Sequence, residues 1–282
     1  MRITLTAAWM LLAAYAAPAL AERDPQSGAP VKPGKHEASN PITDHFYILG
    51  AFYSPKFKTS LRVDPSSPVP GVTGTPLSAE SDLGLPDKKN MGRVEFMFRL
   101  RERSKVRVDT YQANRTGNKV LTQELVIGDT TFAAGQATHT ELNVRQFDIT
   151  YTYSIIHKEH FELGTGIACY FLQVELLTQA PGQREDVSAA SPFPALPLDM
   201  SWVISRRWSL TGHGAYFKAN HDGFDGWYAD YHLDTQYRWN PNFVVGLGYT
   251  NMRSSVGRNS GSLPGVVNTS THGPEAFIRF SF

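Results

Sequence analysis

The chain has 282 residues, of which 41% are hydrophobic and 12% aromatic, with one cysteine and a formal net charge of +1. The near-zero charge argues against a nucleic-acid-binding surface, and one cysteine excludes a disulfide framework and any site with several cysteine ligands. Beyond the N-terminus, no fully apolar run reaches the roughly 20 residues that a membrane-spanning helix requires. Composition thus excludes a helical membrane protein without excluding a protein that crosses a membrane with strands.

The N-terminus predicts export. Arg2 precedes the mainly apolar run 3–17, and a small-x-small cleavage pattern follows it. We therefore predict a signal peptide over residues 1–21. Residues 22–43 are rich in proline, glycine and charge and show no apolar period, which predicts a disordered periplasmic leader. The remaining residues, 44–282, form the predicted folded domain.

From residue 45 onward, apolar and polar residues alternate with period two, which is the pattern of a β-strand with two different faces. In the run 91–100, for example, Val94, Phe98 and Leu100 share one face, whereas Arg93 and Arg99 share the other. Ten such runs are predicted, at 45–53, 91–100, 106–114, 147–155, 161–171, 196–204, 208–217, 227–238, 243–249 and 272–282. No helical period is present.

The connections between these runs alternate between short and long. Short ones fall at 102–104, 157–160, 205–207 and 239–242; longer ones fall at 54–90, 115–140, 178–195, 220–225 and 255–270. Most strands match the roughly 9–11 residues needed to cross a bilayer, and short turns at one end with long loops at the other are typical of outer-membrane barrels. The predicted fold is all-β: a transmembrane, antiparallel, up-and-down β-barrel.

We expect about ten strands, with a range of eight to twelve, because residues 56–63 could pair separately. Aromatic residues support a membrane setting because they gather near the short-turn ends of the strands, as an interfacial girdle does. They are Tyr153, Phe161, Trp202, Trp208, Tyr237, Phe243 and Phe280. The alternative is a soluble lipocalin-like barrel, whose apolar face would point inward instead.

The chain resembles the small Gram-negative outer-membrane β-barrel proteins, of about ten strands. Phe282, preceded by alternating apolar residues, looks like the C-terminal signal read by the barrel-assembly machinery. Three blocks, 81–85, 128–132 and 222–226, are similar to segments of a large, poorly characterised family of such barrels. This resemblance implies a location in the cell outer membrane and contact with outer-membrane lipid and lipopolysaccharide. It implies no catalytic residues.

If the apolar face meets lipid, the polar face lines the lumen. The predicted lumen residues are Arg93, Glu95, Arg99, Arg107, Asp109, Asp148, Asp199, Asp230, His232, Asp234, Arg238, Glu275 and Arg279. Both charges are present, and a ten-stranded barrel is little wider than the eight-stranded kind that side chains fill. These residues are interpreted either as an internal ion-pair network or as a narrow polar path for small solutes. A wide porin channel is excluded by the strand number.

Asp230 and His232 are weak catalytic candidates because a carboxylate beside a histidine can orient it as a general base. The pair resembles one half of the omptin protease site. The second half, an aspartate pair, lacks a counterpart, because Asp82 and Asp87 do not have the expected spacing. The His-x-Ser pattern of outer-membrane lipid hydrolases is also absent.

We therefore predict a non-enzymatic integral outer-membrane protein, either structural or passing small solutes. The alternatives are an outer-membrane hydrolase, either omptin-like or lipid-acting, and a surface adhesin that acts through long outer loops such as 178–195. No cofactor, metal site or nucleic-acid partner is expected, and the sequence does not indicate an oligomeric state.

Overall fold

A computed structural model describes residues 39–65, 73–221, 224–258 and 265–282. The predicted signal peptide, and the predicted leader up to residue 38, lie outside the described residues and stay predictions. Among the described residues, no helix has the length and apolar character needed to cross a bilayer.

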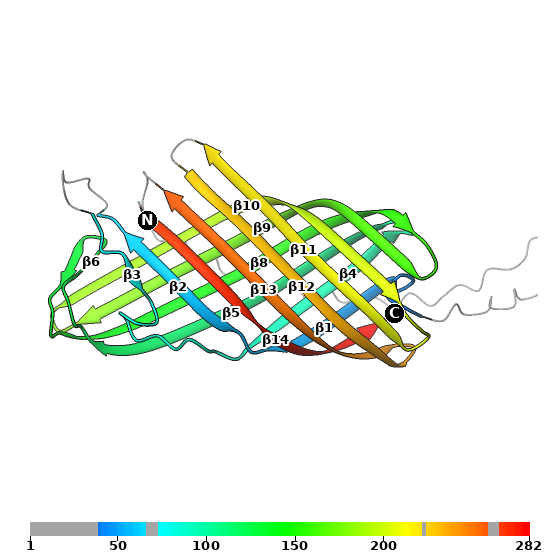
Figure 1. Ribbon diagram of the computed structural model, residues 1–282, viewed down its shortest axis with the longest axis horizontal. Helices are drawn as coiled ribbons and strands as arrows, with labels where there is room; N and C mark the ends of the chain where they lie inside the picture. The colour runs from blue at the N-terminus through cyan, green and yellow to red at the C-terminus, as the bar shows by residue number, and fades with distance from the viewer. Residues whose placement is uncertain (1–38, 66–72, 222–223, 259–264) are drawn as a thin grey trace, which may run out of the picture. The chain divides into compact units, whose positions relative to one another are not determined.

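Ten antiparallel strands close into a barrel, as predicted, because the first strand pairs with the last (Figure 1). They are β1 (Phe46–Tyr53), β4 (Met91–Arg101), β5 (Ser104–Val120), β8 (Ala137–His157), β9 (Phe161–Ala180), β10 (Gln183–Val203), β11 (Trp208–His221), β12 (Phe224–Asn240), β13 (Phe243–Arg258) and β14 (Gly265–Ser281). Closure leaves this sheet without a free edge along the ladder that joins β1 to β14, so backbone groups there are hydrogen-bonded within the wall.

The first barrel strand is divided in two. β1 pairs with one end of β14, from Tyr47 opposite Ser281 to Tyr53 opposite Glu275. After a break at Ser54 and Pro55, β2 (Lys56–Val63) continues along the other end of β14. The separate pairing that we considered for residues 56–63 therefore occurs, and it extends the wall without adding a full strand.

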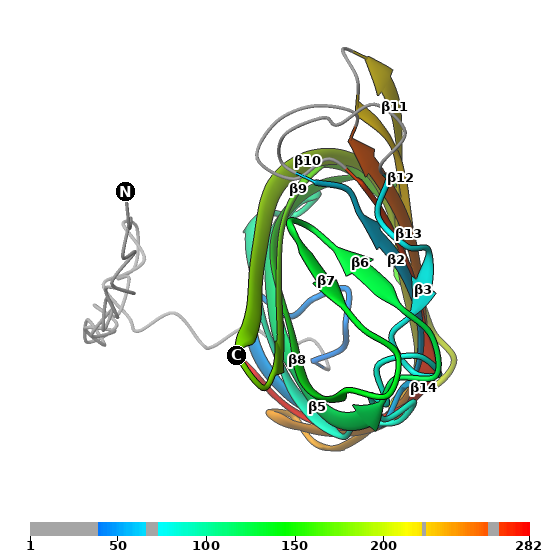
Figure 2. The same cartoon turned by 90° about the vertical axis from the view of Figure 1, so that its left-hand side faces the viewer.

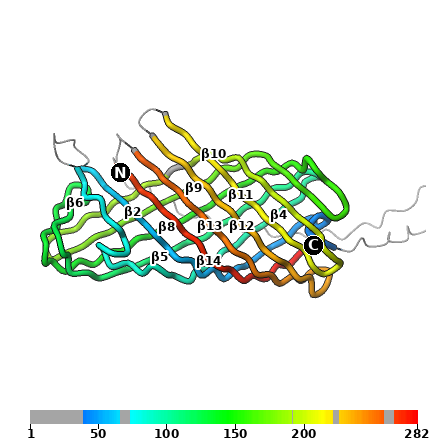
Figure 3. Tube along the Cα trace, in the orientation of Figure 1, coloured from blue at the N-terminus to red at the C-terminus, as the bar shows by residue number. Residues whose placement is uncertain are grey.

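Short turns, the first described residues from Ser39 onward and the C-terminal Phe282 mark one end of the barrel, here called the proximal end, and the opposite end is called distal. At the proximal end the His45 amide donates to the Phe282 carbonyl at 3.0 Å. The Cα trace shows the strands running obliquely between the two ends (Figure 3). The proximal connections correspond to the predicted short turns, because each joins two long strands through only a few residues.

A hairpin and an extended segment close the distal end. β6 (Leu125–Ile127) and β7 (Thr130–Phe132) form the hairpin, which lies across the ring of strands in Figure 2. β3 (Leu77–Ser78) begins the segment, which runs past Gly84 and against β5. A Cβ on Gly117 would lie 2.4 Å from the Gly84 carbonyl oxygen, so only glycine permits this close approach.

The β6–β7 hairpin and the segment that begins with β3, together called the cap, have an apolar core of their own. It contains Leu61, Val63, Leu77, Ala79, Leu83, Leu85, Leu121, Leu125, Ile127, Phe132, Leu142 and Leu176, all buried. These side chains come from β2, β8, β9 and the distal connections, so their packing joins the cap to the barrel wall. Apolar burial of this kind is the main stabilising contribution in such a cluster.

The outer surface of the barrel wall is apolar. Exposed large side chains include Ile48, Phe52, Val94, Phe98, Phe147, Ile149, Ile167, Phe171, Leu196, Leu198, Trp202, Trp208, Leu233, Leu247, Ile278 and Phe280. Monomeric soluble proteins rarely expose a contiguous apolar surface of this size, whereas membrane barrels require one. The soluble alternative, with its apolar face inward and its charges outward, does not fit this arrangement.

Strands extend into four of the predicted loops, which are 115–140, 178–195, 220–225 and 255–270. Residues 178–195 were expected to form a long loop, but β9 and β10 extend through this range and meet at a turn of Pro181 and Gly182. Within 115–140, β5 and β8 likewise extend and leave 121–136 as the connection. The prediction was wrong here because it required apolar alternation. A strand with polar groups on both faces is still stabilised by its backbone ladder and shows no such pattern.

The leader prediction also ends too late. Residues 39–43, assigned to the disordered leader, form a turn in which the Asn40 side chain accepts hydrogen bonds from the amides of Ile42, at 2.8 Å, and Thr43, at 3.1 Å. Ile42 is only 3% exposed. An asparagine that bonds its own following backbone is a common turn device, so this end of the segment is ordered.

Candidate functional site

The proximal end of the lumen is closed around Asp44. The Asp44 carboxylate accepts hydrogen bonds from Arg238 at 2.7 Å, from Arg279 at 3.0 Å and from the Ser39 hydroxyl at 2.7 Å. Arg238 also donates to the Pro241 carbonyl at 2.6 Å. Asp44 is thus a shared partner of the predicted lumen residues Arg238 and Arg279. The sequence analysis placed Asp44 at the start of the folded domain but predicted no role for it.

A second ion-pair group lies beside the first. Both terminal nitrogens of the Arg99 guanidinium donate to the Glu162 carboxylate, at 2.8 and 3.1 Å, and Lys105 lies 3.6 Å from the same group. Ser154 donates to Glu162 at 2.5 Å. Glu162 and Lys105 were not among the predicted lumen residues. Glu162 lies on the inward face of β9, directly after a turn. Its position between the apolar residues Phe161 and Leu163 could have indicated that it faces the lumen.

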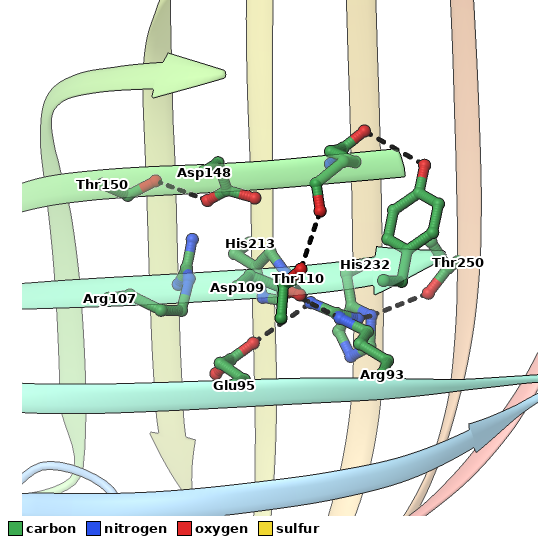
Figure 4. A network of polar contacts seen from close by, with 12 residues as sticks. Arg93, Glu95, Arg107, Asp109, Thr110, Asp148, Thr150, His213, His232 and Thr250 are labelled. Carbon is green, nitrogen blue, oxygen red and sulfur yellow. Dashed lines mark hydrogen bonds and ion pairs between the residues drawn. The ribbon is translucent and has the colours of Figure 1, made fainter. Parts of the chain in front are cut away.

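Arg93 is the centre of the lumen network (Figure 4). Its guanidinium donates to Asp109 at 2.6 Å, to Glu95 at 3.1 Å and to Glu275 at 3.2 Å. It also lies 3.0 Å from Nδ1 of His232 and 3.2 Å from Nε2 of His213. These partners belong to β4, β5, β14, β12 and β11, so one side chain links strands across the barrel. His213 was not predicted.

His232 is held on both ring nitrogens. Its Nδ1 lies 2.8 Å from the Thr250 hydroxyl, and its Nε2 lies 3.1 Å from Asp234 and 3.2 Å from Glu275. The ring stacks on that of His213 with centroids 4.4 Å apart. Two hydrogen-bonding nitrogens and a stacked face fix the position of this imidazole.

Asp230 is not the partner of His232. The contacts made by His232 are to Asp234 and Glu275, while the buried Oδ1 of Asp230 has no hydrogen-bond partner in the described part of the chain. The structure therefore brings His232 together with carboxylates from its own strand and from β14, and does not form the predicted Asp230–His232 pair. The spacing of two residues along a strand places both on one face but does not bring them into contact.

Further polar contacts fill the space between these groups. Arg107 donates to Asp199 at 2.5 Å, and Thr152 donates to the same carboxylate at 2.8 Å. Asp148 accepts from Thr150 at 3.3 Å. A cavity of about 50 Å³ remains beside this network, enough for one or two waters at about 30 Å³ each.

All predicted lumen residues lie in the barrel interior. The buried ones are Arg93, Glu95, Arg107, Asp109, Asp148, Asp199, His232, Asp234, Arg238, Glu275 and Arg279. Arg99 and Asp230 are half-buried. Most of these acids and bases form ion pairs with one another, which is the arrangement that makes buried charge tolerable. Within the described ranges, Asp148 and Asp230 are not part of an ion pair.

The distal half of the lumen is lined mainly by apolar side chains, with the buried Arg115–Glu80 pair among them, and this apolar lining was not predicted. Tyr170, Phe193 and Tyr228 pack their rings together, with centroids 4.7 to 5.9 Å apart. Beyond them lies a cavity of about 200 Å³. Its lining includes Phe57, Leu142, Val144, Leu172, Val174, Leu176, Val187 and Met252. The sequence feature that could have predicted this apolar lining is a second set of apolar residues at the inward-facing positions of the distal strand ends. Leu172, Val174 and Leu176 in β9 are an example.

Phe282 ends the chain at the proximal rim. Its side chain is 64% exposed, its amide donates to the Phe46 carbonyl at 2.8 Å, and its ring stacks on Phe46 at 6.0 Å. The proposed role of Phe282 as an assembly signal stays a prediction. Within the described ranges, no group of three or more His, Cys, Asp or Glu side chains is arranged to hold a metal ion.

Comparison with known proteins identifies the fold. The chain is similar to the outer membrane protease OmpT of Escherichia coli, with a TM-score of 0.56 at 10% identity, over 84% of this chain and 96% of that one. Ail of Yersinia pestis, the attachment invasion locus protein, is also matched, with a TM-score of 0.35 at 9% identity over 85% of this chain and 99% of that one. No protein-family model and no curated protein matches the sequence.

The likeness to OmpT shows that this chain has the fold of an outer-membrane β-barrel protein, with ten strands, which confirms the predicted resemblance and fold class. At 10% identity it shows the fold alone.

Proposed function

We propose that the protein is a non-enzymatic integral outer-membrane barrel whose proximal lumen is a closed structural core. The observation that supports this most strongly is the Arg93 network, in which one buried guanidinium contacts groups from five strands. A charge pair that crosses the lumen ties opposite sides of the wall together. The exposed apolar belt supports a lipid setting, and the fold class supports the outer membrane and its lipids as surroundings.

This proposal favours a structural lumen over a path for solutes. A hydrated ion crossing the barrel would have to displace the Arg93, Arg107 and Arg99 ion pairs as well as the group around Asp44. Breaking one buried pair by removing a partner costs about 3–5 kcal/mol. Several such pairs in series support a lumen that stays closed at rest.

Planar-bilayer recording tests the closed lumen. Purified protein inserted into a bilayer is expected to show no steady conductance. A D44A/R93A/R107A/E162A variant, which disrupts each of the ion-pair groups named above, is expected to conduct in discrete steps. Steady single-channel conductance from the unaltered protein would overturn the proposal. Insertion is verified in each case by the shift in electrophoretic mobility between unheated and boiled samples.

The non-enzymatic part of the proposal is supported by the environment of His232. Both ring nitrogens already have partners, and Asp230 does not contact the ring. A general base must have a nitrogen within reach of the proton that it removes. We expect no hydrolysis of peptides or of lipopolysaccharide acyl chains by the purified protein. Activity that disappears in both D230A and H232A would show that the proposal is wrong.

A further inference from the structure

The distal cavity is the most distinct feature that the proposed function does not use. It occupies about 200 Å³ within the barrel, between β2, β13 and β14 on one side and β5, β8, β9 and β10 on the other. Leucine, valine and phenylalanine side chains make up most of its lining. A closed structural core would fill this space with side chains, as it does in the proximal half, because packed interiors leave few voids larger than water.

The charged side chains at the cavity already have partners. Arg115 is 1% exposed and donates to Glu80 at 2.6 Å and to the Thr59 hydroxyl at 2.7 Å, while its guanidinium lies 4.4 Å from the centroid of Phe57. Arg62 pairs with Asp64 at 3.0 Å. Both cations are therefore neutralised before any ligand arrives. An anionic ligand would have to displace these carboxylates, so the lining favours an uncharged one.

The volume limits the size of such a ligand. An apolar cavity of about 150 Å³ stays dry and admits benzene. A cavity of about 200 Å³ therefore accommodates a molecule slightly larger than benzene, of about eight non-hydrogen atoms. The mainly apolar lining also carries hydroxyl groups, among them those of Thr59, Ser254 and Thr271. A mainly apolar pocket with a small number of polar groups is the usual character of a small-molecule site.

Described side chains lie at both ends of the barrel around this cavity. Distally, the cap core of Leu83, Leu125 and Phe132 is buried. Proximally, the ion-pair groups fill the lumen. A route through the wall would avoid both of these groups.

The wall has a seam between β10 and β11. Their ladder runs from Val203 opposite Ser209 to Leu196 opposite Tyr216, and no further β10–β11 pair occurs among the described residues. Both strands continue distally, β10 to Gln183 and β11 to His221, and the views down and across the barrel show them diverging (Figures 1 and 2). Pro194 lies just past the last pair, and proline is typical of strand edges because it has no N–H to donate.

An aromatic pair bridges this seam at the cavity. The ring of Phe193, which lines the cavity, stacks on that of Phe217 in β11 at 5.8 Å. Phe217 itself does not line the cavity. The two strands have no backbone pairing at this level, so a change of rotamer at Phe217 would remove this side-chain contact between them.

From these observations we infer that the distal lumen is a binding site for a small, neutral, apolar molecule, which enters sideways from the lipid between β10 and β11. Hydrophobic partition supplies the affinity, and the paired arginines exclude anions. The inference stands apart from the proposed function, since a barrel can be non-conducting with or without a ligand in this cavity.

Fluorine NMR tests the site, with para-difluorobenzene as the probe and the full protein in detergent micelles. The unaltered protein is expected to give a saturable bound signal that empty micelles lack. V174W places a large side chain in the cavity and is expected to weaken binding by at least about tenfold. F171W adds the same side chain to the exposed face of the same strand, where Phe171 is 44% exposed, and is the matched control. It is expected to bind within about twofold of the unaltered protein.

Folding of each variant is checked by its mobility before and after boiling, and V174F provides a smaller substitution should V174W fail to fold. The inference is overturned if the unaltered protein shows no saturable signal, or if the folded cavity variant binds as well as F171W.

The access route has its own variant. F217A removes the ring that bridges the seam while leaving the cavity lining intact, and it is expected to speed probe exchange several-fold. Y216A is the control because Tyr216 is the neighbouring residue on the outer face, 51% exposed. Equal exchange rates in both variants would refute lateral entry between β10 and β11.

Discussion

The two halves of the lumen differ in what fills them, although the same strands form both. Arg93, Arg99 and Arg107 pair with carboxylates in the proximal half, whereas Leu142, Val174 and their neighbours surround a cavity in the distal half. The outer face is apolar where it meets lipid. The outward residues of each strand must therefore be apolar. The inward residues can be charged, if the charges form ion pairs, or apolar, if the side chains pack together.

The largest expected effect is in the proximal half. R93A leaves Asp109, Glu95 and Glu275 buried without their shared cation, so we expect the free energy of unfolding to fall by about 3–5 kcal/mol. Denaturant unfolding in detergent, followed by tryptophan fluorescence, measures the change. A loss below about 1 kcal/mol would mean that the network is not a structural core.

The control for this variant is R184A. Arg184 pairs with Asp186 at 3.4 Å, but its side chain is 59% exposed. Exposed pairs contribute about 0–1 kcal/mol because water and salt screen them. We expect the two arginine substitutions to differ clearly in the same assay.

The next largest effect is expected in the cap core. L142A removes a side chain that is 2% exposed and packed within the apolar cluster, and should destabilise the protein by about 2–4 kcal/mol. Leu142 also borders the distal cavity, so the variant enlarges the space open to a probe. An unchanged unfolding midpoint would indicate that the cap packs only loosely on the barrel.

A smaller effect than in the proximal network or the cap core, although larger than in the R184A control, is expected at the tip of the β9–β10 hairpin. Gly182 has a φ of 77°, and a Cβ at this position would meet nothing within 4 Å. G182A therefore costs only the backbone strain of a left-handed residue, about 1–2 kcal/mol. The strain is confined to the tip, so we expect faster hydrogen exchange only at the amides of the hairpin. The lumen variants, in contrast, should lower the stability of the whole barrel. Unaltered exchange at the tip would argue against a rigid turn.

The sequence was informative wherever lipid imposes a pattern. Val94 and Phe98 on one face of β4, and Arg93 and Glu95 on the other, already indicated which side faces outward. The closed ten-stranded barrel followed from the number and length of such runs. The polar residues on the inward face were also identified, because charge rarely faces lipid.

The sequence analysis did not predict structural features that are independent of contact with lipid, such as the distal strand extensions and the turn at 39–43. The distal part of β10 carries polar residues on both faces, and in β9 the apolar residues Leu172, Val174 and Leu176 lie on the inward face, so the alternation that marks the outer face does not continue there. The ordered turn at 39–43 was assigned to the leader because it is polar and contains proline. Its order comes from Ile42 and Asp44 packing into the barrel end, which local composition does not show.

Period two in the chain determined the fold, the inward set of charges and the outward set of apolar side chains, because each strand meets lipid on one side whatever its neighbours are. Partners within the lumen depended on assembly. Arg93 reaches His232 across 139 positions in the chain, and Arg238 reaches Asp44 across 194. The register and closure of the whole barrel decide which carboxylate pairs with which base, because only these bring such distant side chains within hydrogen-bonding distance. They also decide where a cavity is left unfilled.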